Sequence, residues 1–174
     1  MSITVALDEL LNYSDQERHK WEEWLAADPS RLRLPLQGGG RFPTVAELLD
    51  HVFLVERRHL ARLEGATPPG STGVPAGDIA ALFEYARLVR ADFRRYVADT
   101  DDAGAAEAMT IALPDGNSYV MPRRQLAVHI LLHEIRHLAQ LALAARLAGH
   151  APPGEHDLFY FNVGSGLSRN PHLK

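Results

Sequence analysis

The fold is decided by residues 121–149, MPRRQLAVHILLHEIRHLAQLALAARLAG. Pro122 suits the first turn of a helix, and Gly149 suits the residue just after its end. The apolar residues between them recur at helical spacing, so we expect one long helix here. This helix also carries three histidines at intervals of four residues, which raises the question of a metal site.

Three more long helices are expected before this one. The apolar pattern predicts helices at about residues 5–27, 44–64 and 78–99. Thr44 is a good N-cap because Glu47 follows three residues later and can complete a capping box.

A change of period follows the third helix. Two short β-prone runs flank Pro114-Asp115-Gly116-Asn117, which predicts a hairpin directly before the last helix. We expect an all-α four-helix bundle with this small β-hairpin. The apolar residues from Leu158 to Phe161 are expected to pack back on the body of the bundle.

Composition indicates an ordinary globular protein. The chain has 174 residues, 46% of them apolar and 23% charged, so residues 1–174 are expected to form one domain. A net charge of −4 favours neither nucleic acid nor an anionic membrane as a partner. The first residues do not resemble a signal peptide, so we expect a cytoplasmic protein. The apolar tail and spare helix faces make a homodimer a reasonable expectation.

The histidines of the last helix form one stripe. Each residue turns a helix by about 100°, so residues four apart share a face and lie about 6 Å apart along the axis. Two neighbouring imidazoles can therefore reach one ion, whereas the outer two lie about 12 Å apart along the axis. A metal site needs two of these histidines and a ligand from another helix.

His51 is the best partner for such a pair. It shares an apolar stretch with Leu48 and Val55, so we expect it to face the interior. His59 follows Arg57 and Arg58 and is expected on the surface. A single inward histidine is more often a hydrogen-bonded core residue than a ligand. An inward histidine pair on another helix favours ligation.

The sequence HEIRH at residues 133–137 also fits the H-E-x-x-H pattern of zinc peptidases. In such enzymes the glutamate, here Glu134, polarises water. The extended pattern needs glycine and histidine at positions where this chain has Gln140 and Leu143. The nearest later carboxylate, Glu155, follows the end of the helix. A peptidase is therefore the least favoured interpretation.

Residues 42–65 and 129–158, with the hairpin between them, resemble the DinB-like superfamily, which includes the YfiT-type proteins. The resemblance implies a four-helix bundle that binds a divalent metal, commonly zinc or nickel, with iron or manganese as further options. It also implies three histidine ligands, one in the second helix and an H-x-x-x-H pair in the fourth. In this sequence those ligands are His51, His133 and His137.

Four other residues are candidates for the surroundings of the metal. His129 is expected as a pocket group one turn above the site, or as a polar lining. Glu134 either bonds a metal-bound water or pairs with an arginine on the outside of the helix. Gln140 and Asp157 match polar positions of similar proteins and are candidates for orienting ligands or closing the pocket; Asp157 is equally a candidate for anchoring the tail. Where the family has Arg-Gly before the glutamine, this chain has Leu-Ala.

Three neutral imidazoles would leave a divalent metal with its full charge and an open position, which is typical of catalytic or sensing sites. In similar proteins the metal often activates a low-molecular-weight thiol such as bacillithiol or mycothiol, and a chain without cysteine fits that role. We expect a metal-dependent enzyme that acts on a small molecule by thiol transfer, isomerisation or hydrolysis. The alternative is a non-catalytic metal- or ligand-binding bundle, acting in a stress response or as a dimeric partner protein.

Overall fold

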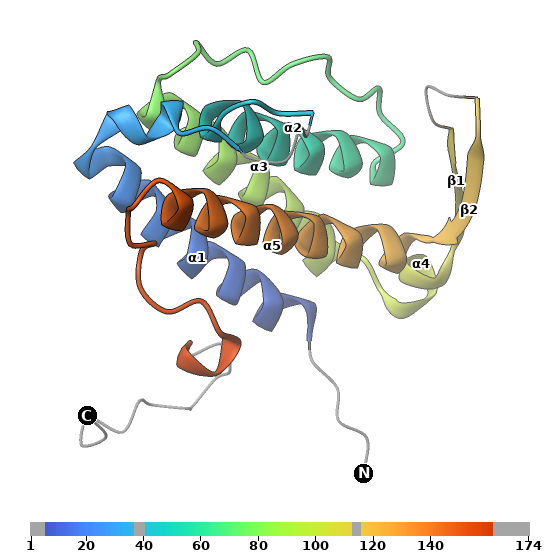
Figure 1. Ribbon diagram of the computed structural model, residues 1–174. Helices are drawn as coiled ribbons and strands as arrows, with labels where there is room; N and C mark the ends of the chain where they lie inside the picture. The colour runs from blue at the N-terminus through green and yellow to red at the C-terminus, as the bar shows by residue number, and fades with distance from the viewer. Residues whose placement is uncertain (1–5, 37–40, 113–115, 162–174) are drawn as a thin grey trace.

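Four long helices form the body of the protein in the computed structural model, which describes residues 6–36, 41–112 and 116–161. The long helices are α1 (Leu7–Ala27), α2 (Val45–Leu63), α3 (Ile79–Asp99) and α5 (Arg123–Leu147). Helices α1 and α2 each pack against α3 and α5, and α2 and α5 lie side by side (Figure 1). The predicted all-α bundle is therefore confirmed.

The helix ends follow local signals in the sequence. The carboxylate of Glu47 accepts a hydrogen bond of 3.0 Å from the backbone N–H of Thr44, which completes the predicted capping box. Gly149, with φ of 80°, takes the left-handed conformation just after α5, where a side chain would be strained. Pro122 was expected in the first turn of α5. It is instead the N-cap, directly before the first helical residue, and also the last residue of β2.

The predicted hairpin is present beside the first turn of α5. Strands β1 (Ala108–Ala112) and β2 (Ser118–Pro122) pair antiparallel. Pro114 and Asp115 of the predicted turn lie outside the described residues. Three short elements were not predicted, because segments of three to five residues are too short to show periodicity. They are η1 (Pro29–Arg33), α4 (Asp102–Ala106) and η2 (Leu158–Tyr160).

The segment after α5 turns back along α1. The hydroxyl of Tyr13 donates a 2.7 Å hydrogen bond to the carbonyl of His156, and the His156 ring stacks on Trp21. Phe161 packs edge-on against Tyr13, as expected for the apolar tail, whereas Phe159 remains 76% exposed. The tail is thus attached to the bundle through part of its apolar patch. No helix in the described ranges is both long enough and apolar enough to cross a membrane.

A layer of buried charged side chains divides the apolar core into two clusters. One cluster contains Trp21 and Phe53, and the other contains Leu11 and Phe93. Between the clusters, a buried charged residue of each long helix joins one network of ion pairs. These residues are Arg18 in α1, Glu56 in α2, Arg90 in α3 and Glu134 in α5. We call them the charged layer.

The charged layer contains two positive and two negative side chains, and each arginine contacts both carboxylates. Arg90 donates hydrogen bonds of 2.7 Å to both Glu56 and Glu134, and Arg18 contacts the same two carboxylates. The hydroxyl of Ser14 donates a further 2.6 Å bond to Glu134. Burial alone would raise the pKa of Glu134, but Arg18 and Arg90 outweigh it and lower the pKa to about 2. The layer is therefore a network of ion pairs that links all four helices.

Candidate metal centre

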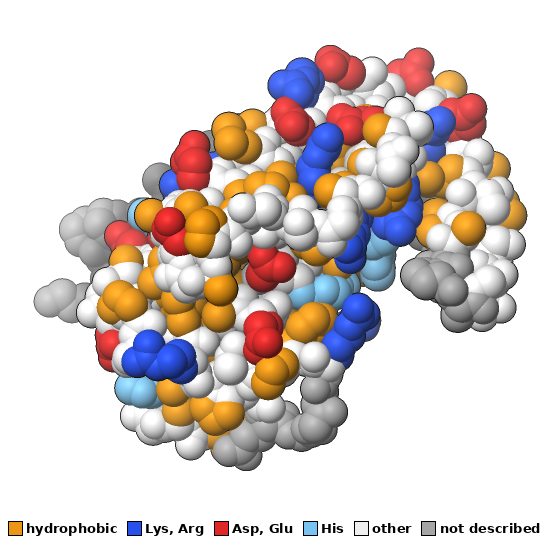
Figure 2. Space-filling view, turned by 90° about the horizontal axis from the view of Figure 1, so that it is seen from above, with side chains coloured by type: hydrophobic (Ala, Val, Ile, Leu, Met, Phe, Trp, Pro, Cys, Tyr) orange, Lys and Arg blue, Asp and Glu red, His pale blue; other side chains and the backbone are white. Residues whose placement is uncertain are grey.

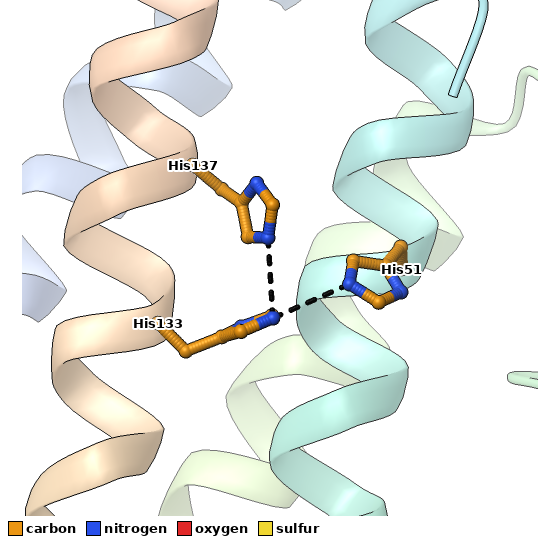
Figure 3. Close-up of side chains that lie close together, drawn as sticks. All are labelled: His51, His133 and His137. Carbon is orange, nitrogen blue, oxygen red and sulfur yellow. Dashed lines mark hydrogen bonds between the residues drawn. The ribbon is translucent and has the colours of Figure 1, made fainter. Parts of the chain in front are cut away.

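Three histidine side chains meet between α2 and α5. His51 projects from α2, and His133 and His137 project from successive turns of α5 (Figure 3). The Nε2 atom of His133 lies 3.3 Å from Nε2 of His51 and 3.1 Å from Nε2 of His137. Each of the three residues offers a ring nitrogen within 4.8 Å of the other two. We call these residues the histidine cluster.

The spacing of the ring nitrogens fits a single metal ion. Two imidazole nitrogens that bind one tetrahedral zinc ion at about 2.0–2.1 Å lie about 3.3 Å from each other. The observed separations of 3.1 and 3.3 Å are close to this value. The histidine cluster can therefore hold a divalent metal ion with only small movements of the rings.

His51 and His133 are held in the form that binds metal. Burial, helped by the nearby His137, Arg41 and Arg58, lowers the pKa of His51 to about 4. Burial and then the neighbouring histidines lower the pKa of His133 to about 3. Both imidazoles are therefore neutral at physiological pH, and a neutral imidazole has a free lone pair for a metal.

Two neighbours hold the rings of the cluster in place. Nδ1 of His137 lies 2.7 Å from Oε1 of Gln140 one turn away, and this oxygen can only accept a hydrogen bond. The proton of the His137 ring is therefore on Nδ1, which leaves Nε2 free to face the cluster. The ring of Phe42 packs against that of His51, with 4.2 Å between the centroids.

Two arginines that pair with no carboxylate among the described residues lie beside the cluster, where Figure 2 shows histidine next to Lys and Arg side chains. The guanidinium of Arg58 donates to the carbonyl oxygens of Pro69 and Gly70, at 2.8 and 2.7 Å. Arg41 packs over the ring of Phe42. Together with His51, both arginines line a cavity of about 760 Å³, which is large enough for a small organic molecule.

Glu134 does not belong to the histidine cluster, although it follows His133 directly. Its carboxylate lies in the charged layer, where it binds Arg18, Arg90 and Ser14. Neither expectation for this residue, a bond to metal-bound water or a pair with an arginine on the outside of α5, describes this position. A zinc peptidase would need this carboxylate beside the metal, but here it forms ion pairs inside the bundle.

His129 extends the row of histidines by one turn and meets a residue that the sequence placed on the surface. Its ring centroid lies 5.8 Å from that of His133 and 5.3 Å from that of His59. His59 is half-buried, and burial, with Arg62, His129 and Arg58, lowers its pKa to about 4. The neighbouring arginines led to the wrong prediction that His59 lies on the surface. Its spacing of about two helical turns from His51 indicates that both residues share one face of the helix.

Asp157 lies away from these residues, at the start of η2, in the segment that packs on α1. Its side chain is exposed, and the structure does not bring it into the histidine cluster. This location argues against a role in closing the pocket, and the anchoring of the tail by Asp157 stays a prediction.

The architecture and the histidine cluster agree with what comparison with known families finds. No similar sequence is found among curated proteins. The sequence model of one family, described as the DinB family, matches residues 1–163, which is nearly the whole chain. The protein therefore belongs to the DinB family.

Proposed function

We propose that the protein is a metal-dependent enzyme that acts on a small molecule, with His51, His133 and His137 as the metal ligands. The observation that carries this proposal is the open side of the ligand set. Within the described residues, no fourth histidine or carboxylate joins the cluster. Structural zinc sites usually have four protein ligands, whereas catalytic sites keep three and leave one position for water or substrate.

A zinc or nickel ion bound by three neutral imidazoles would lower the pKa of a water or thiol that enters the open position. The side chains around the cluster support such chemistry. Gln140 accepts a hydrogen bond from the His137 ring, and Phe42 packs against the His51 ring. The adjoining cavity is lined by charged groups of both signs: the guanidinium groups of Arg41 and Arg58, and the carboxylates of Glu47, Asp50 and Asp78.

The composition of the chain limits where a thiol nucleophile could come from. It contains no cysteine, so a thiol nucleophile would have to come from a bound low-molecular-weight thiol. Transfer or isomerisation with such a thiol, and hydrolysis by water, both need one activated nucleophile beside a small substrate. The cavity of about 760 Å³ beside His51 has a suitable size for either.

The ligand assignment is tested by metal analysis of the untagged protein purified without a nickel column. We expect about one divalent ion per chain, as for a single three-ligand site. His133→Ala should lose this ion, whereas His19→Ala should retain it, because the His19 side chain is 69% exposed on α1. Retention of the metal by His133→Ala would refute the assignment.

The catalytic part of the proposal needs a separate assay. An electrophilic dye is offered to the metal-loaded protein with bacillithiol, mycothiol or glutathione, and a panel of esters is offered without thiol. We expect turnover that chelation abolishes and that His133→Ala lacks. A metal-loaded protein without turnover on any of these substrates would favour a non-catalytic metal-binding bundle instead.

A further inference from the structure

A second cavity lies under the hairpin, on the other side of the histidine row from Phe42. It has a volume of about 790 Å³, and Figure 2 shows a hollow between the hairpin and the helical body. Its walls are largely apolar and include Tyr119, Val128 and Leu132. We call it the hairpin pocket.

The hairpin pocket reaches the histidine cluster through His129. His129 lines the pocket together with His59, which faces it from α2. On its other side, the His129 ring lies 5.8 Å from that of His133, measured between centroids. Only the His129 side chain would thus separate a molecule in the pocket from His133, one of the proposed metal ligands.

The polar groups of the pocket include two nitrogen donors, from His59 and Arg124, beside the amide of Gln125 and the hydroxyl of Tyr119, which can both donate and accept. Nη1 of Arg62 lies 3.3 Å from Nδ1 of His59, and an arginine can only donate a hydrogen bond. Nδ1 of His59 therefore accepts this bond, and the proton of the neutral ring is on Nε2, where it remains available as a donor. Arg124 adds a guanidinium that pairs with no carboxylate among the described residues.

No acidic side chain lines the hairpin pocket within the part of the chain that the structure describes. An apolar wall, one unpaired guanidinium and one imidazole N–H together suit an apolar body with a single negative charge. A carboxylate matches the planar guanidinium best, because it can accept two parallel hydrogen bonds.

We propose that the hairpin pocket binds a small apolar monoanion, a carboxylate with an aromatic or aliphatic body, and presents it to the histidine cluster. Its role as a substrate site rests on the proposed metal-dependent function. Binding in the pocket does not, because neither Arg124 nor His59 is a metal ligand in that proposal. The two proposals can therefore fail separately.

The test is calorimetric titration of the full chain, freed of metal, with 4-phenylbutyrate, its neutral amide and 4-phenylbutylamine. We expect the carboxylate to bind about tenfold more tightly than the amide, as a charge-assisted bond predicts, and the amine to bind most weakly. Arg124→Gln should remove the preference for the carboxylate while leaving the amide affinity unchanged. Arg146→Gln, on the same helix but outside the pocket, should bind like the wild type.

Val128→Trp provides a steric test, because the larger side chain would occupy the pocket. Both the carboxylate and the amide should then bind weakly, with the circular dichroism unchanged.

Equal affinities for carboxylate and amide in the wild type would overturn the proposal, and so would an Arg124→Gln variant that binds like the wild type. Carboxylate binding only to the metal-loaded protein would overturn it too, since the anion would then be a metal ligand. A dimer that Tyr119→Ser disrupts, without any binding of the probes, would assign the pocket to a second copy of the chain.

Discussion

Replacing Glu134 by glutamine should destabilise the bundle strongly, because this carboxylate neutralises two buried arginines. Glu134 is 1% exposed, and it accepts hydrogen bonds from Arg18, Arg90 and Ser14. A glutamine side chain would fit the same space, but its amide would present N–H groups to guanidinium groups that also only donate. Arg18 and Arg90 would then share a single buried carboxylate, that of Glu56, and the only other negative charge in contact would be the partly exposed Asp15, 2.9 Å from Arg90.

The magnitude follows from the burial of the ion pairs, because removing one partner of a buried pair costs about 3–5 kcal/mol. The lowered pKa of Glu134 points in the same direction, since it means that the folded protein stabilises the ionised carboxylate. Because the folded-state pKa is lowered, this contribution is present above about pH 4.5 and is lost as the pH falls towards 2.

Urea denaturation of the metal-free protein, followed by circular dichroism at pH 7, measures this loss directly. Glu107→Gln is the matched control, since Glu107 is paired with Arg123 on the surface and its side chain is 61% exposed. The control should lose at most about 1 kcal/mol, as exposed ion pairs do.

A Glu134→Gln variant that is as stable as the control would show that the charged layer contributes no net stability, and the reasoning would fail. A variant that keeps its stability but loses all activity would point instead to Glu134 as the catalytic base of a peptidase. The two readouts therefore separate the structural role from the catalytic one.

Three further outcomes are expected. Gln140→Ala should weaken metal binding by about 10–100-fold in competition with a chelator, because the ligand ring loses its hydrogen-bond acceptor; an unchanged affinity would argue against this role. The metal-free protein should become less stable to urea as the pH falls from 6.5 towards 4. In this range His59 and His133 become protonated in the unfolded chain but stay neutral in the folded protein, because folding lowers their pKa. A stability that does not change with pH would contradict the lowered pKa values. Thr44→Ala should lower the free energy of unfolding by about 1 kcal/mol through loss of the capping box at α2, and an effect below about 0.3 kcal/mol would mean that the cap is redundant.

Much of the fold could be predicted from the sequence, because the signals are local. The capping pair Thr44 and Glu47, the glycine after α5 and the change of period at the hairpin all act within a few residues. The pairing of His133 with His137 is equally local, since the pitch of a helix alone places residues four apart on one face. Such features form in the same way wherever the helix later packs.

Only the tertiary structure decided which side chains face one another across the bundle. Helical periodicity states that Glu134 and His133 point in different directions, but not that one meets Arg18 and Arg90 while the other meets His51. That choice depends on how each helix is rotated about its axis against its neighbours. The rotation is set by the packing of all four apolar faces together, so it is written in no single segment of the sequence.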